Sequence, residues 1–344
     1  MNEPAASSPA RSAEVKARLD SLRAALERHG ARSAFLIARR NFAWLTAGGS
    51  NHVVLESETG EAGVFVSADE AVVLAPNIEA RRLVDEELAG TGLDVVAVDW
   101  WRPQGIIGEA SRRGRAGLVS DEDLEPDLEI LRSRLSGFDA ERLAILGGEA
   151  TRAMDVALAM VGSMTTEVEL CAALLAALDD IRAPVLLAAA DDRIARYRHP
   201  LPGDNPIRSR VMLVLVGERW GLHVAVTRFR DLEPRSPDLE ARFAAVTRVQ
   251  EILQEATRAS ATLGEVFAAG QAAYADVGYP DEWQLHHQGG TIAYRGRERV
   301  AKPDDPTVIE PGMAFAWNPS ITGTKVEDTF ILGEEDARRV VTRG

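Results

Sequence analysis

The sequence predicts an α/β protein of two domains. A chain of 344 residues is long enough for two domains that each bury a core of their own. Its first half alternates amphipathic helical segments with short apolar runs, and its second half combines a long β-hairpin with capped helices. We expect a flexible tail over residues 1–13, an N-terminal domain over 14–139 and a C-terminal domain over 140–344.

The N-terminal domain is expected to begin with a helix over residues 14–29. Apolar residues recur at helical spacing from Val15 to Leu26, and Gly30 is typical of a helix end. Short apolar runs then predict strands, and the last of these follows a helix expected over 77–88. The four predicted strands cover residues 34–37, 63–66, 71–74 and 93–98.

Helical periodicity returns from residue 128 to about 160, with a break near Gly137. The pairs Thr166–Glu169 and Thr262–Glu265 are capping boxes, which mark the starts of two further helices. The other elements expected in the second half are a strand over 185–189, a hairpin of 211–216 and 222–229, a helix over 236–260, and strands over 314–317 and 325–332.

Composition limits the class of function. The formal net charge of −14 repels phosphate backbones, so nucleic acid is not an expected partner. The single cysteine, Cys171, cannot form an internal disulfide and is expected to be buried packing in a reducing compartment. The tail lacks the apolar core of a signal peptide, and no apolar run is long enough to span a membrane. We therefore expect a cytoplasmic protein without a membrane association.

Three of the six histidines lie in segments that resemble the loops of binding sites. Pro200 disfavours helix at His199. The pair His286–His287 precedes Gln288 and two glycines, which allow close approach of a ligand to the backbone. An imidazole titrates near neutral pH, so His199 is a candidate general acid or base, the alternative being a loop histidine that caps a strand. His287 could orient substrate or water, whereas His286, as an adjacent strand residue, is expected to face away.

Five short motifs occur along the chain in a recognisable order, namely Arg198–Pro200, Gly221–Arg228, His287–Gly290, Pro311–Met313 and Val326–Thr329. Together with the order of elements, they resemble the creatinase, aminopeptidase P and methionine aminopeptidase superfamily over essentially the whole chain. The resemblance implies a creatinase-like N-terminal α/β domain followed by a C-terminal domain of the pita-bread fold. It also implies a homodimer.

The metallopeptidases of this superfamily hold two divalent cations with two aspartates, one histidine and two glutamates. Matched residue by residue, these positions fall at Leu215, Ala225, His287, Asn318 and Glu327. Three of the five ligands are absent, and a histidine with one carboxylate cannot hold two cations. The sequence therefore predicts no metal site and no other cofactor.

Creatinase, within the same superfamily, hydrolyses a C–N bond without metal, with a histidine as acid–base and an arginine for the substrate carboxylate. The resemblance implies the first role for His199 and the second for Arg297, although Arg297 could instead pair with Glu298. Creatinase has a glutamate where this chain has Asn318, so its proton relay does not carry over; Asn318 could bind an uncharged group or form a turn.

The expected function is that of a metal-independent, creatinase-like hydrolase that cleaves a C–N bond in a small amidino, amide or amino-acid-like substrate. Its expected catalytic residues are His199, His287 and Glu327, the last either holding a histidine in its charged form or activating water. The expected substrate-binding residues are Arg297, Asn318, His286, Gln288 and Lys325. The alternatives are an Xaa-Pro-type metallopeptidase with an atypical site and a non-catalytic binding protein.

Overall fold

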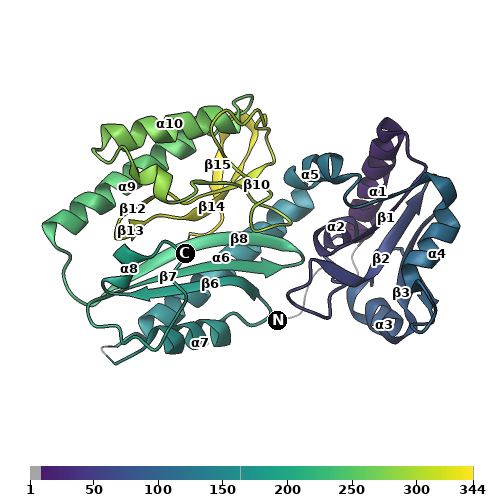
Figure 1. The fold of residues 1–344 in the computed structure, drawn as a ribbon, viewed down its shortest axis with the longest axis horizontal. Helices are drawn as coiled ribbons and strands as arrows, with labels where there is room; N and C mark the ends of the chain where they lie inside the picture. Colours follow the sequence, from purple (N-terminus) through teal and green to yellow (C-terminus); the bar gives the residue numbers. More distant parts are fainter. Residues whose placement is uncertain (1–8, 163, 344) are drawn as a thin grey trace. The chain divides into compact units, whose positions relative to one another are not determined.

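The computed structural model describes residues 9–162 and 164–343, and the chain divides after Arg132 into two compact units (Figure 1). Helix α1 (Pro9–His29) starts earlier than expected, so the prediction of a flexible tail is wrong for residues 9–13; residues 1–8 lie outside the described part. The expected domain boundary, between residues 139 and 140, falls inside helix α6 (Gly137–Ala159).

The first unit is built on a five-stranded sheet with the order β4-β3-β2-β1-β5. Strands β1 to β3 are antiparallel neighbours, and their apolar side chains, such as Phe35, Phe65 and Leu74, pack beneath helix α4. The elements after α1 are β1 (Ser33–Ala38), α2 (Arg39–Leu45), β2 (Thr59–Ser67), β3 (Ala71–Pro76), α3 (Asn77–Arg82), a π-helical turn (Leu83–Glu87), β4 (Asp94–Val98), α4 (Gly105–Gly114), a 3-10 turn (Arg115–Gly117), β5 (Leu118–Ser120) and α5 (Glu125–Ser133).

The second unit contains two larger sheets and a small two-stranded one, β12-β13. After α6, its elements are α7 (Glu167–Ala177), β6 (Arg182–Ala190), α8 (Arg193–Arg196), β7 (Arg210–Arg219), β8 (Leu222–Asp231), α9 (Pro237–Ala256), α10 (Leu263–Asp276), a 3-10 turn (Glu282–Leu285), β9 (Gly289–Thr291), β10 (Arg299–Val300), β11 (Ala314–Trp317), β12 (Ser320–Ile321), β13 (Thr324–Lys325), β14 (Asp328–Leu332), a 3-10 turn (Glu334–Asp336) and β15 (Arg338–Val340).

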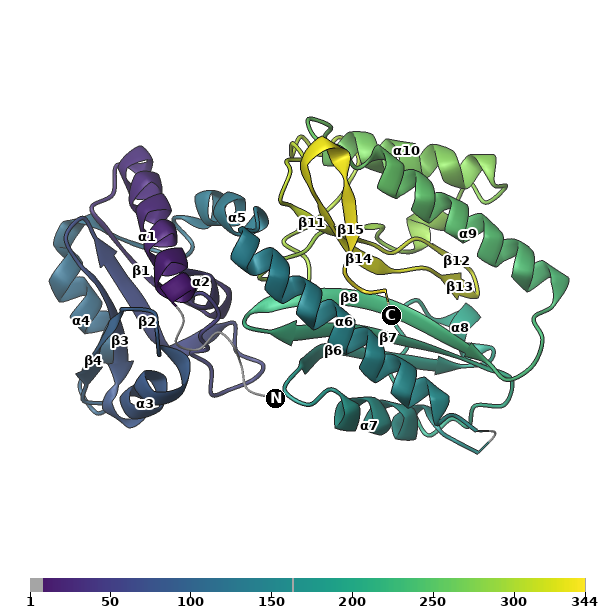
Figure 2. The same ribbon diagram turned by 180° about the vertical axis from the view of Figure 1, so that it is seen from behind.

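The sheet β6-β7-β8 carries one wall of the candidate site. Strand β7 is its central strand and is buried along nearly its whole length, which is why its sequence is a continuous apolar run without polar alternation. Helices α6 and α7 cover one face of this sheet, as Figures 1 and 2 show from opposite sides. The other face meets β14, so polar side chains along that contact lie between two sheets.

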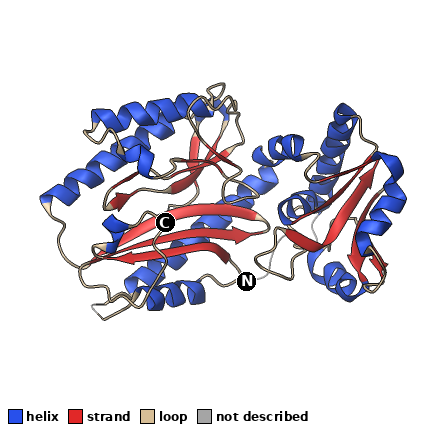
Figure 3. Ribbon diagram, viewed as in Figure 1, coloured by secondary structure: helices blue, strands red, loops and turns tan. Residues whose placement is uncertain are grey.

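The second sheet, of order β10-β9-β11-β14-β15, packs against α9 and α10 (Figure 3). Its core includes a stack of three aromatic rings from Phe315, Trp317 and Phe330. The single strand expected over 325–332 is divided into β13 and β14, because Lys325 pairs with β12 while Glu327 forms an isolated bridge with β8. Lys325 and Glu327 are two residues apart in extended backbone, so their side chains share one side and form an ion pair. In the part of the chain described, no helix is long and apolar enough to cross a membrane.

Candidate active site

Three histidines from two distant loops meet in the second unit. The Nε2 atoms of His199 and His286 are 3.0 Å apart, and the His286 and His287 rings stack with their centroids 4.5 Å apart. His199 is exposed, whereas His286 is only 8% exposed. The expectation that His286 faces away is wrong. Both histidines precede β9, so the alternation of strand side chains does not apply to them.

Arg198 joins the loop of His199 to the loop of His286. Its guanidinium donates to the Glu282 carboxylate at 2.5 Å and to the hydroxyls of Ser320 and Thr322 at 3.1 and 2.9 Å. Glu282 lies in the turn just before His286, and it also accepts from Thr322 at 2.7 Å. Charge-assisted hydrogen bonds of this kind are the stronger ones in proteins, so they fix His199 relative to the other two histidines.

Gln288, expected to bind substrate, uses its side chain within the loop itself. It is 2% exposed; its amide donates to the backbone oxygens of His286 and Trp283 at 2.6 and 3.2 Å, and its carbonyl accepts from Tyr274 Oη at 2.8 Å. These contacts stabilise the conformation of the loop. Burial raises the pKa of Tyr274, which keeps its hydroxyl protonated as a donor. Sequence reasoning missed Tyr274, since nothing in its helix distinguishes it from a core residue.

The two glycines after Gln288 serve strand packing. A Cβ on Gly289 would lie 2.1 Å from the Ala316 carbonyl oxygen, and one on Gly290 would lie 2.1 Å from that of Arg299. Both glycines also have positive φ angles, 96° and 152°. The backbone that approaches closely is therefore that of the neighbouring strands, in place of the ligand that the sequence suggested.

Glu327 is a buried carboxylate held by two cations and a hydroxyl. It is 2% exposed; Oε1 accepts from Arg297 at 2.7 Å, and Oε2 accepts from Lys325 at 2.9 Å and Thr227 at 2.7 Å. Arg297 thus pairs with Glu327 and not with Glu298, the alternative that the sequence left open. Burial alone would raise the pKa of Glu327, but Lys325, Arg297 and the hydrogen bonds lower it to about 2. Such a carboxylate is ionised at neutral pH and is a weak base.

The β7–β8 hairpin is the position at which two aspartates would bind metal in the metallopeptidases that the motifs resemble. Strand pairing places Val216, and not Leu215, directly opposite Ala225. Facing residues share one side of a sheet, so Leu215 and Ala225 point to opposite sides. The side of Ala225 is that of the site, because Thr227, two residues further along β8, donates to Glu327. The match of Leu215 to a ligand position is therefore wrong, and the residues of β7 on the site side at this point are Val214 and Val216.

A pair of divalent cations does not fit the residues present. Val216 and Ala225, 9% and 0% exposed, offer no ligand atom on the site face, and Asn318 supplies a neutral amide where a carboxylate is needed. The Glu327 carboxylate is already bound by Lys325 and Arg297, which bring two positive charges against its one negative charge. Side-chain cations therefore occupy the charge environment that metal ions would need.

Burial, and after it the same cations, favour the neutral form of the three imidazoles. Burial and then the charge of Lys325 lower the pKa of His286 to about 3. Burial and then the charges of Arg297 and Lys325 lower the pKa of His287 to about 4. His199 is exposed as a residue, but its ring is partly enclosed by the site, and this partial desolvation and then Lys325 lower its pKa. Neutral imidazoles at neutral pH can accept protons or donate one ring hydrogen.

Three neutral imidazoles can also bind a single transition-metal ion. The nearest ring nitrogens of His199, His286 and His287 lie within 4.8 Å of one another, a group that stands out among the described residues as a possible ligand set. Three histidines with an open fourth position form a known type of catalytic zinc site. The positive field of Lys325 and Arg297 opposes such an ion, as it opposes protonation of the same rings.

Two buried polar atoms near Glu327 have no hydrogen-bond partner among the described residues. They are Oδ1 of Asn318, a side chain that is 2% exposed, and Nε of Arg297. A buried polar atom without a partner is unfavourable by about 1–3 kcal/mol. One unused acceptor and one unused donor in a positively charged site are what a polar ligand with a carboxylate and an N–H group could satisfy.

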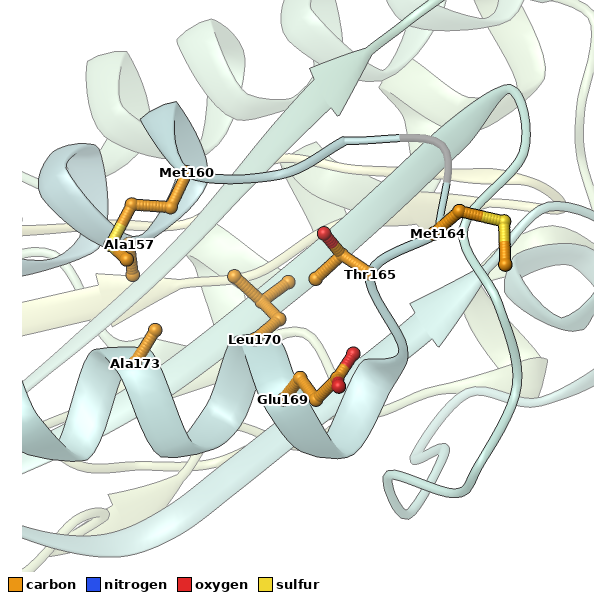
Figure 4. A pocket seen from close by; sticks show the side chains of 7 residues that line it. All are labelled: Ala157, Met160, Met164, Thr165, Glu169, Leu170 and Ala173. Atoms are coloured by element: carbon orange, nitrogen blue, oxygen red, sulfur yellow. The ribbon is translucent and has the colours of Figure 1, made fainter.

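A hollow on the surface lies apart from these groups, between the end of α6 and the start of α7 (Figure 4). Among the described residues that line it, only Glu169 is charged, and it is used in the capping box with Thr166. Cys171 on the same helix is buried, and burial raises the pKa of its thiol to about 11, so it is not a nucleophile. The lining residues are Ala157, Met160, Met164, Thr165, Glu169, Leu170 and Ala173.

Comparison with known proteins agrees with this architecture. A model of metallopeptidase family M24 matches residues 142–336, and no sequence among curated proteins matches the chain. A dipeptidase from Pyrococcus horikoshii OT3 has a TM-score of 0.78 at 18% identity, covering 95% of this chain and 98% of its own. The dipeptidase PepE from Mycobacterium ulcerans has a TM-score of 0.75 at 19% identity, and the match covers 97% of this chain and 96% of PepE. The prolidase from Pyrococcus horikoshii OT3 has a TM-score of 0.75 at 16% identity, and the match covers 95% of this chain and 98% of the prolidase. The likeness confirms the predicted fold, a creatinase-like N-terminal domain before a pita-bread domain.

Proposed function

Because this chain belongs to metallopeptidase family M24, we propose that it is a hydrolase of C–N bonds in small amino-acid-like substrates that works without a metal ion. The observation that carries this proposal is the pairing of Glu327 with both Lys325 and Arg297. The two side-chain cations supply the positive charge of the site, and Val216 and Ala225 on the hairpin offer no ligands for a metal pair. The family membership that the motifs predicted is confirmed by the family match.

In this proposal, Arg297 and Lys325 attract the substrate carboxylate, and their excess of one positive charge over Glu327 is balanced when it binds. Glu327 acts as their fixed counter-ion, because a carboxylate with a pKa of about 2 is too weak a base to activate water at neutral pH. His199 is the general acid–base, since its ring is neutral and exposed and is held by the Arg198 network next to the cations.

The unpaired atoms extend this assignment to the reacting amide. Asn318 offers an unused acceptor, Oδ1, which can hold an N–H of the substrate. His287 offers a ring nitrogen that can contact the carbonyl oxygen of the same amide. The substrate class that fits these groups carries a free carboxylate and an uncharged amide or amidino group, as dipeptides and N-substituted amino acids do.

A second candidate is a peptidase with one transition-metal ion held by His199, His286 and His287. The three-histidine cluster favours it, since its nitrogens lie within 4.8 Å of one another. Such an ion would supply Lewis-acid chemistry and would remove His199 from its role as acid–base. The positive charges of Lys325 and Arg297 make us prefer the metal-independent proposal.

The experiment is a turnover assay of purified protein, with and without chelator, on dipeptides and N-substituted amino acids. Each substrate is paired with its carboxyl-amidated form. We expect turnover that chelator leaves unchanged, and a loss of about 10- to 100-fold in kcat/KM for the amidated forms, because a charge-assisted hydrogen bond contributes about 1.5–3 kcal/mol.

Two outcomes would contradict the proposal. Absence of turnover on the whole panel would favour a non-catalytic binding protein. Activity that chelator removes and that one equivalent of zinc, manganese or cobalt restores would favour the second candidate, and metal analysis of the restored protein would give the stoichiometry.

A further inference from the structure

We propose that His286 is a positioning residue that fixes the tautomer of His199, so that Nδ1 of His199 is the atom that exchanges protons with the substrate. This inference rests on the proposed role of His199 as acid–base, and it names the atom and the partner that give it that role. It follows from two hydrogen bonds that connect a backbone carbonyl, His286 and His199 in series.

The series begins at the backbone oxygen of His287, which lies 2.6 Å from Nδ1 of His286. A carbonyl oxygen can only accept, so Nδ1 of His286 must carry the hydrogen. His286 is only 8% exposed, and burial away from water disfavours the charged imidazolium, so its ring is neutral. Its other nitrogen, Nε2, therefore has a free lone pair and is an acceptor.

The second bond transmits this arrangement to His199. Nε2 of His286 is 3.0 Å from Nε2 of His199, and two acceptors at that distance would repel each other. His199 must therefore donate through Nε2. In its neutral form the remaining nitrogen, Nδ1, carries the lone pair and is the basic atom. The series contains no carboxylate. The backbone oxygen of His287 at its end fixes the orientation of the His286 ring instead.

His287 takes the opposite form. The backbone N–H of Gly289 lies 3.3 Å from Nδ1 of His287 and can only donate, so Nδ1 is the acceptor and Nε2 carries the hydrogen. With a pKa of about 4, His287 stays neutral at working pH and can donate this hydrogen without losing it. The site then holds one basic nitrogen on His199 and one neutral donor on His287, an arrangement suited to water activation and to stabilising an oxyanion.

The proton transfers balance with His199 alone. Water gives a proton to Nδ1 of His199 as its oxygen bonds to the substrate carbon, and the same proton passes to the leaving nitrogen as the C–N bond breaks. Between the two steps His199 is an imidazolium that still donates through Nε2 to His286. The charged groups that act on it are Lys325 and Arg297, which disfavour the imidazolium, and Glu327, which favours it. His286 and His287 remain neutral throughout.

The test is the long-range ¹H–¹⁵N spectrum of protein labelled with ¹⁵N in its histidine rings, which reports directly which ring nitrogen carries hydrogen. We expect His199 and His287 to be protonated at Nε2 and His286 at Nδ1. The matched variants are His286→Gln and, as a control on the exposed end of α1, His29→Gln. His286→Gln should convert His199 to a mixture of tautomers, while His29→Gln should remove one set of signals and leave the others unchanged.

A His199 signal protonated at Nδ1 in the wild-type protein would overturn the proposal, whether or not the variant folds. The spectrum needs no substrate, so its failure is distinct from failure of the proposed hydrolase function. Once a substrate is known, His286→Gln should lower kcat about 10- to 100-fold with little change in KM, since it disturbs orientation and tautomer without removing a substrate contact. A change confined to KM would instead indicate that His286 binds the substrate.

Discussion

Replacing His199 by alanine is expected to lower kcat/KM by about 100- to 10,000-fold, the usual contribution of a general acid–base. The protein should remain folded, because His199 is exposed and its loop is held by Arg198 rather than by the imidazole. Substrate binding should change little, since Arg297, Lys325 and Asn318 are untouched. The measurement is kcat and KM on the best substrate of the panel, with circular dichroism to verify the fold.

The control for this variant is His29→Ala, at the end of α1, which should retain full activity. Equal turnover of His199→Ala and the wild type would remove His199 from the mechanism. The pH profile gives a second reading. Burial and Lys325 lower the pKa of His199, so activity should persist to a lower pH than an ordinary histidine would permit.

Glu327→Gln is expected to lower the free energy of unfolding by about 3–5 kcal/mol, the typical effect of removing one partner of a buried ion pair. The amide leaves Lys325 and Arg297, 6% and 15% exposed along their side chains, without a counter-ion. Urea unfolding measures the change. Glu255→Gln serves as the matched control, because Glu255 is 61% exposed and its loss should change stability by less than about 1 kcal/mol.

The loss should also depend on pH. The pKa of Glu327 falls from the ordinary 4.5 to about 2 on folding, so its contribution is complete above pH 4.5 and is lost as the pH falls toward 2. The difference in stability between the wild type and Glu327→Gln should therefore shrink over that interval. A difference that stays constant down to pH 2, or one below 1 kcal/mol at neutral pH, would contradict a buried carboxylate that anchors both cations.

The sequence predicted the elements whose signals are local. The capping boxes Thr166–Glu169 and Thr262–Glu265 both begin helices, α7 and α10, where expected. Helix α4 was not predicted, because its glycines weaken the helical pattern and its start depends on the left-handed backbone of Gln104. The tail was misjudged for a similar reason: the Ala, Ser and Pro composition of residues 1–13 conceals the start of α1 at Pro9.

The candidate site could be predicted only in part. Lys325 and Glu327 are two residues apart, so extended backbone places them on one side, and their ion pair was within reach of sequence reasoning. The contact of Arg297 with Glu327 was not, because it depends on how separate loops pack. The same holds for His199 and His286, which are 87 residues apart along the chain.

The position of Leu215 shows a different limit. A match of short motifs counts residues, whereas the direction of a side chain depends on strand register, which no single motif reveals. The register turns Leu215 away from the site, and the residues of β7 on the site side there, Val214 and Val216, are also apolar. None of Val214, Val216 and Ala225 is an aspartate, so no carboxylate stands at these positions of the hairpin.

We propose that Lys325 and Arg297 take the charge role of a metal pair around Glu327. The most direct measurement is anomalous X-ray scattering from crystals soaked in manganese or zinc salt, which locates bound ions independently of activity. We expect no ion beside Glu327, with the Lys325 ammonium and the Arg297 guanidinium still bound to its carboxylate. Two well-occupied ions bridged by Glu327, with both side-chain cations displaced, would contradict it.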